Sequence, residues 1–323
     1  MKKEKIIATI HRTNLPTFSS IHKIPGNTSG KTKSDKKTGF SQRLIDIARA
    51  RGHTMNEILE YDIIPDITLF QEDGLMRKGN KSLLTAELEK QLTPDDYIFS
   101  INQNDERLAC IVDTMAYVRK VKTSDITTFG ELCASVIKIT HCHASVSKRV
   151  DYVFDAYCEG TIKDSERKRR SHVQPIELSK IDSSTKLPVE MEKFWPSSKN
   201  KLNLEIILHK EIIETSNKYV RDQEVVAGFI PGENAVECIS ISNRNMRPYP
   251  ELNLYYEEAD ALILHHVVHL LRCGFQNILV LSADTDVLVI LLHFFFVLQE
   301  LGLKELWVRS GIRESVRHIP VMH

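Results

Sequence analysis

The stretch ILVLSADTDVLVILLHFF, residues 278–295, decides the fold. Its apolar content suggests a membrane span at first, but Asp284, Asp286 and His293 lie inside it, and burial of carboxylates in lipid is costly. The run ILVLS has the length of a strand, and the apolar run after the two aspartates has the length of a helix. The stretch therefore predicts a buried strand followed by a buried helix in a soluble protein.

Other segments place a short apolar run in the same setting. LACIV (108–112) is followed directly by Asp113, YVF (152–154) is followed by Asp155, and LWV (306–308) fits an adjacent strand. Continuous apolar runs that lead into helical segments are typical of buried parallel strands. The chain is therefore expected to form an α/β fold with a parallel sheet and flanking helices. The remaining expected elements are a helix over 199–219 and a pair of strands over 224–241.

Carboxylates follow these strands at the point where each strand ends. In an open parallel sheet, ligands bind outside the carboxyl ends of the strands, so these side chains are expected at one edge. Taken singly, Asp113 or Asp286 fits a helix N-cap about equally well. The recurrence of a strand followed by aspartate, together with an acidic group that opens a helix at 257–260, favours a shared site. The acidic set comprises Asp113, Asp155, Glu257, Glu258, Asp260, Asp284 and Asp286.

An acidic cluster of this kind predicts metal-assisted hydrolysis of phosphodiesters. Converging carboxylates repel each other and persist where cations neutralise them, and oxygen-only ligands favour Mg²⁺ or Mn²⁺. Two such ions about 3.5–4 Å apart can hold the attacking and the leaving oxygen of a phosphodiester. Histidine and cysteine form no comparable set, because His269 and Cys273 stand one helical turn apart but no second pair has the spacing of zinc ligands.

The order of the acidic motifs resembles the PIN-like nuclease superfamily, in particular its flap-endonuclease branch. The motifs are IVD (111–113), VFD (153–155), EEAD (257–260) and SADTDV (282–287). Longer segments around them are similar to a set of uncharacterised, multicopy animal proteins that carry a PIN-like domain. The resemblance implies a PIN-like fold, two Mg²⁺ or Mn²⁺ ions, and structure-specific cleavage of nucleic acid. The residues that match the family's metal-binding and catalytic carboxylates are Asp113, Asp155, Glu258, Asp260, Asp284 and Asp286.

A basic run follows Asp155 closely in the sequence. The segment KDSERKRR (163–170) carries Lys163, Arg167, Lys168, Arg169 and Arg170. The resemblance implies that these residues contact the phosphate backbone of nucleic acid, since phosphate contacts position a bound strand. A solvated helix surface is an equally good interpretation of the same run.

Charge and composition divide the chain into three parts. The whole chain has 323 residues with 43 basic and 43 acidic side chains, so no overall field points to nucleic acid or to a membrane. We expect a flexible basic arm over 1–42, a helical region over 43–104, and the PIN-like domain over 105–323. The family continues past the counterpart of 319–321, so the resemblance implies truncation at the C-terminal end. Cysteines without CxxC pairs, and no secretory signal, favour a nuclear or cytoplasmic intracellular location.

Two other interpretations of the same residues compete with the nuclease. A catalytically inactive PIN-like module that binds nucleic acid or protein would share the fold and most of the motifs. The DxD motif after a strand also occurs in haloacid-dehalogenase phosphatases, but that fold needs a lysine and further acidic residues well downstream of it. A metal titration separates the nuclease from the inactive module. Trp195, Trp307 and the aromatic run 294–296 are expected in the core, and the oligomeric state is left open.

Overall fold

The computed structural model describes residues 45–59, 81–93, 105–157, 173–219, 222–232, 235–256, 259–311 and 316–321. The chain forms two compact units, Met1–Asn80 and Lys81–His323. In the first unit, residues 45–50 are helical and α2 spans Met55–Leu59. The predicted basic arm lies outside the described residues. The second unit begins with α3 (Lys81–Glu89) and contains the α/β fold.

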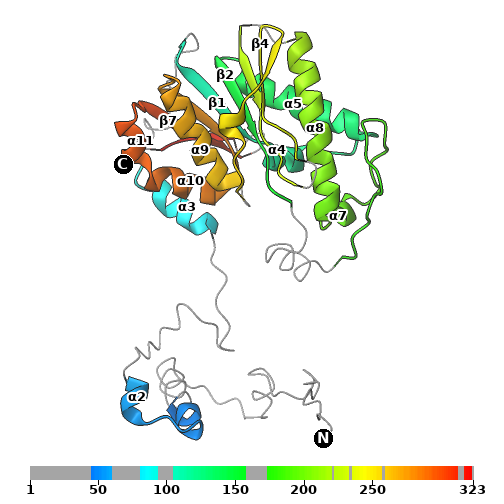
Figure 1. Cartoon of the computed structure of the whole chain (residues 1–323). Helices are drawn as coiled ribbons and strands as arrows, with labels where there is room; N and C mark the ends of the chain where they lie inside the picture. Colours follow the sequence, from blue (N-terminus) through cyan, green and yellow to red (C-terminus); the bar gives the residue numbers. More distant parts are fainter. Residues whose placement is uncertain are drawn as a thin grey trace, which may run out of the picture. The chain divides into compact units, whose positions relative to one another are not determined.

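The second unit is built on one mostly parallel sheet (Figure 1). Its eight strands lie in the order β5-β4-β3-β2-β1-β6-β7-β8. Five strands, β3, β2, β1, β6 and β7, run parallel to one another in the middle of the sheet. Strand β4 pairs antiparallel with β3, β5 pairs antiparallel with β4, and β8 pairs antiparallel with β7. The strands are β1 (Leu108–Asp113), β2 (Arg149–Val153), β3 (Glu224–Ala227), β4 (Ile239–Ser242), β5 (Asn245–Pro248), β6 (Asn277–Leu281), β7 (Glu305–Ser310) and β8 (Arg317–Pro320).

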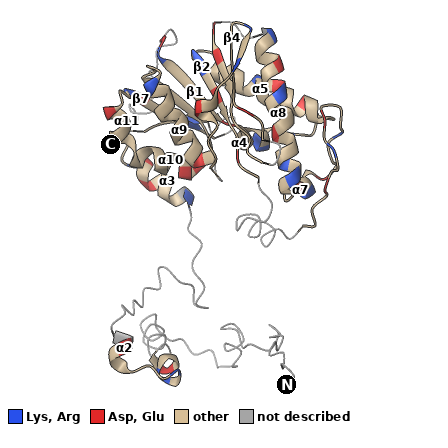
Figure 2. Ribbon diagram, in the orientation of Figure 1, with Lys and Arg blue, Asp and Glu red and all other residues tan. Residues whose placement is uncertain are grey.

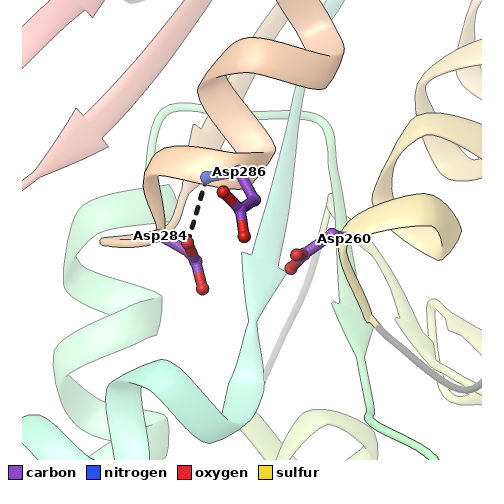
Figure 3. Close-up of side chains that lie close together, drawn as sticks. All are labelled: Asp260, Asp284 and Asp286. Atoms are coloured by element: carbon purple, nitrogen blue, oxygen red, sulfur yellow. Dashed lines mark hydrogen bonds between the residues drawn. The ribbon is translucent and has the colours of Figure 1, made fainter. Parts of the chain in front are cut away.

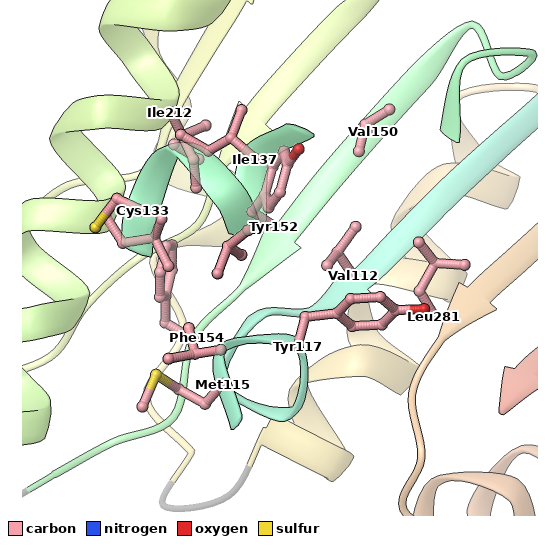
Figure 4. Packing of buried hydrophobic residues seen from close by; sticks show 14 of the residues in the cluster. Val112, Met115, Tyr117, Cys133, Ile137, Val150, Tyr152, Phe154, Ile212 and Leu281 are labelled. Carbon is pink, nitrogen blue, oxygen red and sulfur yellow. The ribbon is translucent and has the colours of Figure 1, made fainter. Parts of the chain in front are cut away.

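Helices cover both faces of this sheet, which explains why β1 and β6 are apolar along almost their whole length. Along β1, Cys110 and Val112 pack into the core on one face, whereas Ala109 and Ile111 pack into the core on the other. Figure 4 shows the first of these cores. The helices on that face are α4 (Thr114–Lys120), α5 (Phe129–Ala144), α7 (Met191–Phe194) and α8 (Ser198–Tyr219). The other face carries α9 (Ala259–Arg272), α10 (Thr285–His293) and α11 (Phe295–Glu300), with α3 against α10.

The sequence-based elements agree with this architecture, with one shift in β2. An α/β fold, the strands at 108–112, 278–282 and 306–308, and the strand pair within 224–241 are confirmed. Strand β2 begins at Arg149, earlier than the apolar run predicts, because its first half carries buried charges. Arg149 and Asp151 point to the same face and form an ion pair with a distance of 2.7 Å from Nε to Oδ1.

The prediction that the aromatic run 294–296 lies in the core is wrong for two of its three residues. Phe295 is buried, but Phe294 and Phe296 are 38% and 54% exposed. Helix α10 ends at His293 and α11 begins at Phe295, so consecutive aromatic residues point in different directions and only one of them faces the sheet. Trp307 is buried as expected. None of the helices in the described part of the chain has both the length and the apolar character that a membrane crossing requires.

Candidate metal centre

The carboxyl edge of the sheet has a topological switch point between β1 and β6. From β1 the chain continues to β2 on one side, whereas its neighbour on the other side is β6, which comes much later in the sequence. Helices from the two faces diverge at such a point and leave room for a ligand outside the strand ends. Asp113 is the last residue of β1, and Asp284 follows the end of β6. The switch point is therefore lined by carboxylates.

Three aspartates from two helices meet at this edge (Figure 3). Asp260 lies in the first turn of α9, Asp284 is the N-cap of α10, and Asp286 lies in the first turn of α10. One carboxylate oxygen from each lies within 4.8 Å of the others. Oxygen ligands surround a bound Mg²⁺ or Ca²⁺ at about 2.0–2.6 Å, so oxygens with this spacing can share one ion. This group could hold a metal ion, and it is the one such group in the part of the chain that the structure describes.

The start of α10 fixes two of these side chains through one local hydrogen bond. The Asp286 N–H donates to Oδ1 of Asp284 at 3.0 Å, which caps the helix. The cap uses one oxygen of Asp284, and the Asp286 carboxylate lies between Asp284 and Asp260 in the view of Figure 3. The positive end of the α10 dipole partly offsets the repulsion between the two charges. The sequence S-A-D-T-D therefore presents two carboxylates at one helix end without loss of the cap.

Asp113 lies deeper than these three and is joined to them by Ser282. The Ser282 hydroxyl donates to Oδ2 of Asp113 at 2.8 Å and accepts the N–H of Asp284 at 3.1 Å. The Ala116 N–H donates to the other Asp113 oxygen at 3.1 Å. Burial raises the pKa of Asp113 to about 6, the two hydrogen bonds lower it, and the charges of Asp155 and Asp284 add to the increase. A bound cation would favour the ionised carboxylate.

Asp155 connects the end of β2 to the start of α9. Its Oδ1 accepts the Ala259 N–H at 3.1 Å, and its Oδ2 accepts the Tyr157 hydroxyl at 2.9 Å. Its own N–H donates to Oε1 of the buried Glu205 at 3.1 Å. Because Ala259 directly precedes Asp260, the contact from Asp155 sets the position from which the Asp260 side chain reaches the other aspartates.

The structure thus brings five of the predicted carboxylates to one edge of the sheet and leaves the others undescribed. Asp260, Asp284 and Asp286 form the close group, while Asp113 and Asp155 lie beside it. Glu257, Glu258 and the whole basic run 163–170 lie outside the described residues. His269 and Cys273 are near each other, with 3.7 Å between Nδ1 and Sγ, but no third ligand joins them among the described side chains.

Sequence reasoning missed Lys81, the first residue of α3. Its ammonium group forms an ion pair with Asp286, and the hydrogen bond to Asp286 together with the charges of Asp284 and Asp260 raises its pKa, against a lowering by desolvation. Acidic residues gather where α10 begins, near the start of α3 (Figure 2). One turn further, Thr85 bonds to Thr285 at 3.3 Å between hydroxyl oxygens. Nothing near Lys81 in the sequence indicates this contact, which spans 205 positions.

Replacing Lys81 with Gln is expected to tighten divalent-cation binding by about twofold to fivefold. The ammonium group competes with a metal ion for Asp286, and a partly exposed ion pair contributes at most about 1 kcal/mol. The measurement is a Mn²⁺ titration followed by electron paramagnetic resonance. Lys90→Gln is the matched control, because Lys90 is an exposed residue at the other end of α3 and pairs with Glu87. Weaker binding by the Lys81→Gln protein would contradict a competition for Asp286.

Replacing Asp113 with Asn is expected to stabilise the metal-free protein at pH 7 but not at pH 4. The folded-state pKa of about 6 lies above the ordinary value of 3.8. The folded state therefore holds this proton more tightly, and up to about 3 kcal/mol of unfolding free energy is lost as the pH rises from 4 through 6. Asn avoids this loss but accepts one hydrogen bond fewer, so the net gain at pH 7 is about 1–2 kcal/mol.

The measurement for Asp113→Asn is denaturant unfolding in EDTA at both pH values. Asp125→Asn is the control, because Asp125 is exposed. If Asp113→Asn had a lower unfolding free energy than the wild type at pH 7, the ionised Asp113 carboxylate would not be destabilising the folded protein.

Comparisons of the chain with models of known protein families, with curated protein sequences and with solved structures give no match. The function is therefore inferred from the geometry of the sheet edge.

Proposed function

We propose that the Lys81–His323 unit is a PIN-like nuclease domain of the flap-endonuclease type, which uses Mg²⁺ or Mn²⁺ to hydrolyse phosphodiesters in nucleic acid. One observation carries this proposal: three aspartates from α9 and α10 place carboxylate oxygens within 4.8 Å of one another at the switch point of the sheet. Carboxylates at this distance repel one another, and a bound cation would relieve that repulsion.

The order of the elements supports the PIN-like assignment. In the resemblance described above, one aspartate ends a strand, a second follows the next strand, an acidic group opens a helix, and a DxD motif follows a further strand. Here Asp113 ends β1, Asp155 follows β2, Asp260 lies at the start of α9, and Asp284 and Asp286 follow β6. All four positions lie at the carboxyl edge of the parallel strands, where an α/β sheet binds its ligands.

Each aspartate has a distinct task in this proposal. Asp260, Asp284 and Asp286 are the ligands closest to one another, and a bound ion would activate water and stabilise the developing charge on a phosphodiester. Asp113 extends the acidic edge toward β1, and Ser282 holds it in place by the 2.8 Å hydrogen bond to Oδ2. Asp155 positions the start of α9 through the Ala259 N–H and adds negative charge beside Asp113.

A second candidate is a module that binds nucleic acid or protein without cleaving it. The ion pair between Lys81 and Asp286 favours this candidate, because it gives the acidic group a cation from the chain itself. Both oxygens of Asp155 also accept hydrogen bonds within the chain. A protein of this kind would fold identically but bind divalent cations only weakly.

The proposal is tested by incubating the protein with single-stranded, duplex and branched DNA and RNA, with Mg²⁺, Mn²⁺ or EDTA. We expect cleavage of at least one branched substrate with either cation and none in EDTA. Nucleic-acid binding without cleavage under every condition, combined with no saturable binding of Mn²⁺, would favour the inactive module instead.

A further inference from the structure

A second group of charged side chains lies near Asp113, and its charges are positive. We call it the Arg309 cluster, after the residue at its centre. Its members come from four elements that are distant in the sequence, namely α4, α5, β7 and β8. The Arg309 cluster consists of Tyr117, Lys120, His143, Arg309 and His318.

The sheet register and two ring contacts bring these side chains together. Arg309 lies opposite Leu281 of β6 and opposite His318 of β8. The ring of Tyr117 extends over the sheet toward Leu281, next to Arg309's strand (Figure 4). The Lys120 Nζ atom lies 4.4 Å from the centre of the Tyr117 ring, and the His143 ring centre lies 6.1 Å from it. Tyr117 therefore packs against both Lys120 and His143.

The cluster holds buried donors that lack an acceptor. The Nζ atom of Lys120 and the Nε atom of Arg309 have almost no solvent contact and no hydrogen-bond partner among the described residues. Leaving a charged donor buried and unpaired is strongly unfavourable, so a partner such as water or a ligand is expected at these atoms. Burial lowers the pKa of Lys120, Asp113 acts in the opposite direction, and Arg309 adds to the decrease. Two cations thus share one site with too little negative charge.

The two histidines add no further charge to the cluster at neutral pH. Burial, with the charges of Arg309, Lys120 and His318, lowers the pKa of His143 to about 4. Burial and Arg309 also lower the pKa of His318. Neutral imidazoles can each donate one hydrogen bond to an oxygen. The cluster therefore offers an ammonium group, a guanidinium group and the imidazole of His143 to a single anion.

We propose that the Arg309 cluster is a binding site for a phosphate group. The planar fork of an arginine and the point charge of a lysine together suit a tetrahedral anion with several oxygens. Among the described residues no carboxylate accepts a hydrogen bond from Lys120 Nζ or Arg309 Nε, although the charge of Asp113 acts on Lys120, so these two buried donors are left for a ligand.

The position of the site suggests which phosphate it takes. Lys120 ends α4, whose seven residues begin directly after Asp113 and rise about 10 Å along the helix. A phosphate in the Arg309 cluster would therefore lie beside the aspartates and could belong to the nucleic-acid strand that they hold. This last step rests on the proposed function, whereas the phosphate site itself does not.

The test uses the full chain in EDTA, so that its result is independent of metal binding and of cleavage. The variant carries Lys120→Gln with Arg309→Gln, and the control carries Lys138→Gln with Lys304→Gln, which removes equal charge at exposed positions. The double variant is expected to fold, because the change removes unpaired buried charges. One probe is inorganic phosphate, followed by the thermal midpoint, and the other is an oligothymidine without terminal phosphates, followed by fluorescence anisotropy.

We expect phosphate to raise the midpoint of the wild type and of the control by about 3 °C for each tenfold excess over its dissociation constant. The Lys120/Arg309 variant should keep only the small general stabilisation that phosphate salts give. For the oligothymidine, we expect the variant to bind at least about tenfold more weakly than the control, with a salt slope smaller by about 0.7 per lost phosphate contact.

If phosphate raised the thermal midpoints of the wild type, the Lys120/Arg309 variant and the control equally, the Arg309 cluster would not be a phosphate site. A lost phosphate response with unchanged oligothymidine binding would keep the site but assign it to free phosphate, and would overturn the link to a bound strand. An Asp284→Asn protein should retain the full phosphate response. Failure of cleavage and failure of the phosphate site are therefore distinguishable.

Discussion

Replacing Asp284 with Asn is expected to abolish metal-dependent cleavage of nucleic acid while the protein stays folded. Asp284 contributes one of the three carboxylates that lie within 4.8 Å of one another. Loss of a residue that only supports a metal ligand reduces activity by up to about 100-fold, so loss of a ligand should exceed that. The amide oxygen of Asn can still accept the Asp286 N–H, which keeps the cap of α10.

The measurement for Asp284→Asn is single-turnover cleavage in Mg²⁺ and in Mn²⁺, together with thermal unfolding in EDTA. Removal of one of several like charges should stabilise the metal-free protein slightly. Asp125→Asn is the control, because it removes an exposed carboxylate far along the chain from the cluster. Cleavage by Asp284→Asn at a rate near that of the wild type would rule out the aspartate group as the catalytic centre.

Replacing Asp151 with Ala is expected to lower the free energy of unfolding by about 3–5 kcal/mol, because it leaves a buried arginine without its main partner. Asp151 is fully buried and accepts two hydrogen bonds from Arg149, at 2.7 and 3.0 Å. Nδ1 of His266 lies 2.7 Å from its second oxygen. Burial alone would raise the pKa of Asp151, but the charge of Arg149 and the hydrogen bond from His266 lower it to about 2.

A double variant separates the cost of an unpaired charge from the cost of lost packing. Arg149→Met combined with Asp151→Leu replaces the ion pair by apolar side chains, and it should lose less stability than Asp151→Ala alone. Denaturant unfolding at pH 7 measures all three proteins. A loss under about 1 kcal/mol for Asp151→Ala would mean that Tyr249 and Glu224, the other partners of Arg149, are sufficient to stabilise it.

The same buried pair shows which parts of the fold the sequence could predict. Strands β1 and β6 were found because helices cover both faces of the sheet, so that almost every position along them is apolar. The start of β2 was missed because Arg149 and Asp151 neutralise each other inside the core, and no local pattern reveals such a pair. Strand β5 was missed because its four residues are all exposed and carry no apolar alternation.

The candidate site was partly predictable for a similar reason. An aspartate directly after a buried strand is visible in the sequence, and parallel strands bring such residues to a common edge. Lys81 was not predictable, because its contact with Asp286 depends on how α3 packs against α10. The Arg309 cluster draws on four elements, so its charges come together only through the sheet order and the register of β7 with β6 and β8.

The central claim is that the aspartates at the switch point bind divalent cations, and a Mn²⁺ titration followed by electron paramagnetic resonance tests it most directly. The wild type should show saturable binding of one or two ions per chain. A protein with both Asp284→Asn and Asp286→Asn should lose this binding while its thermal unfolding stays cooperative. Absence of saturable binding by the wild type, or equal binding by the double variant, would contradict the claim.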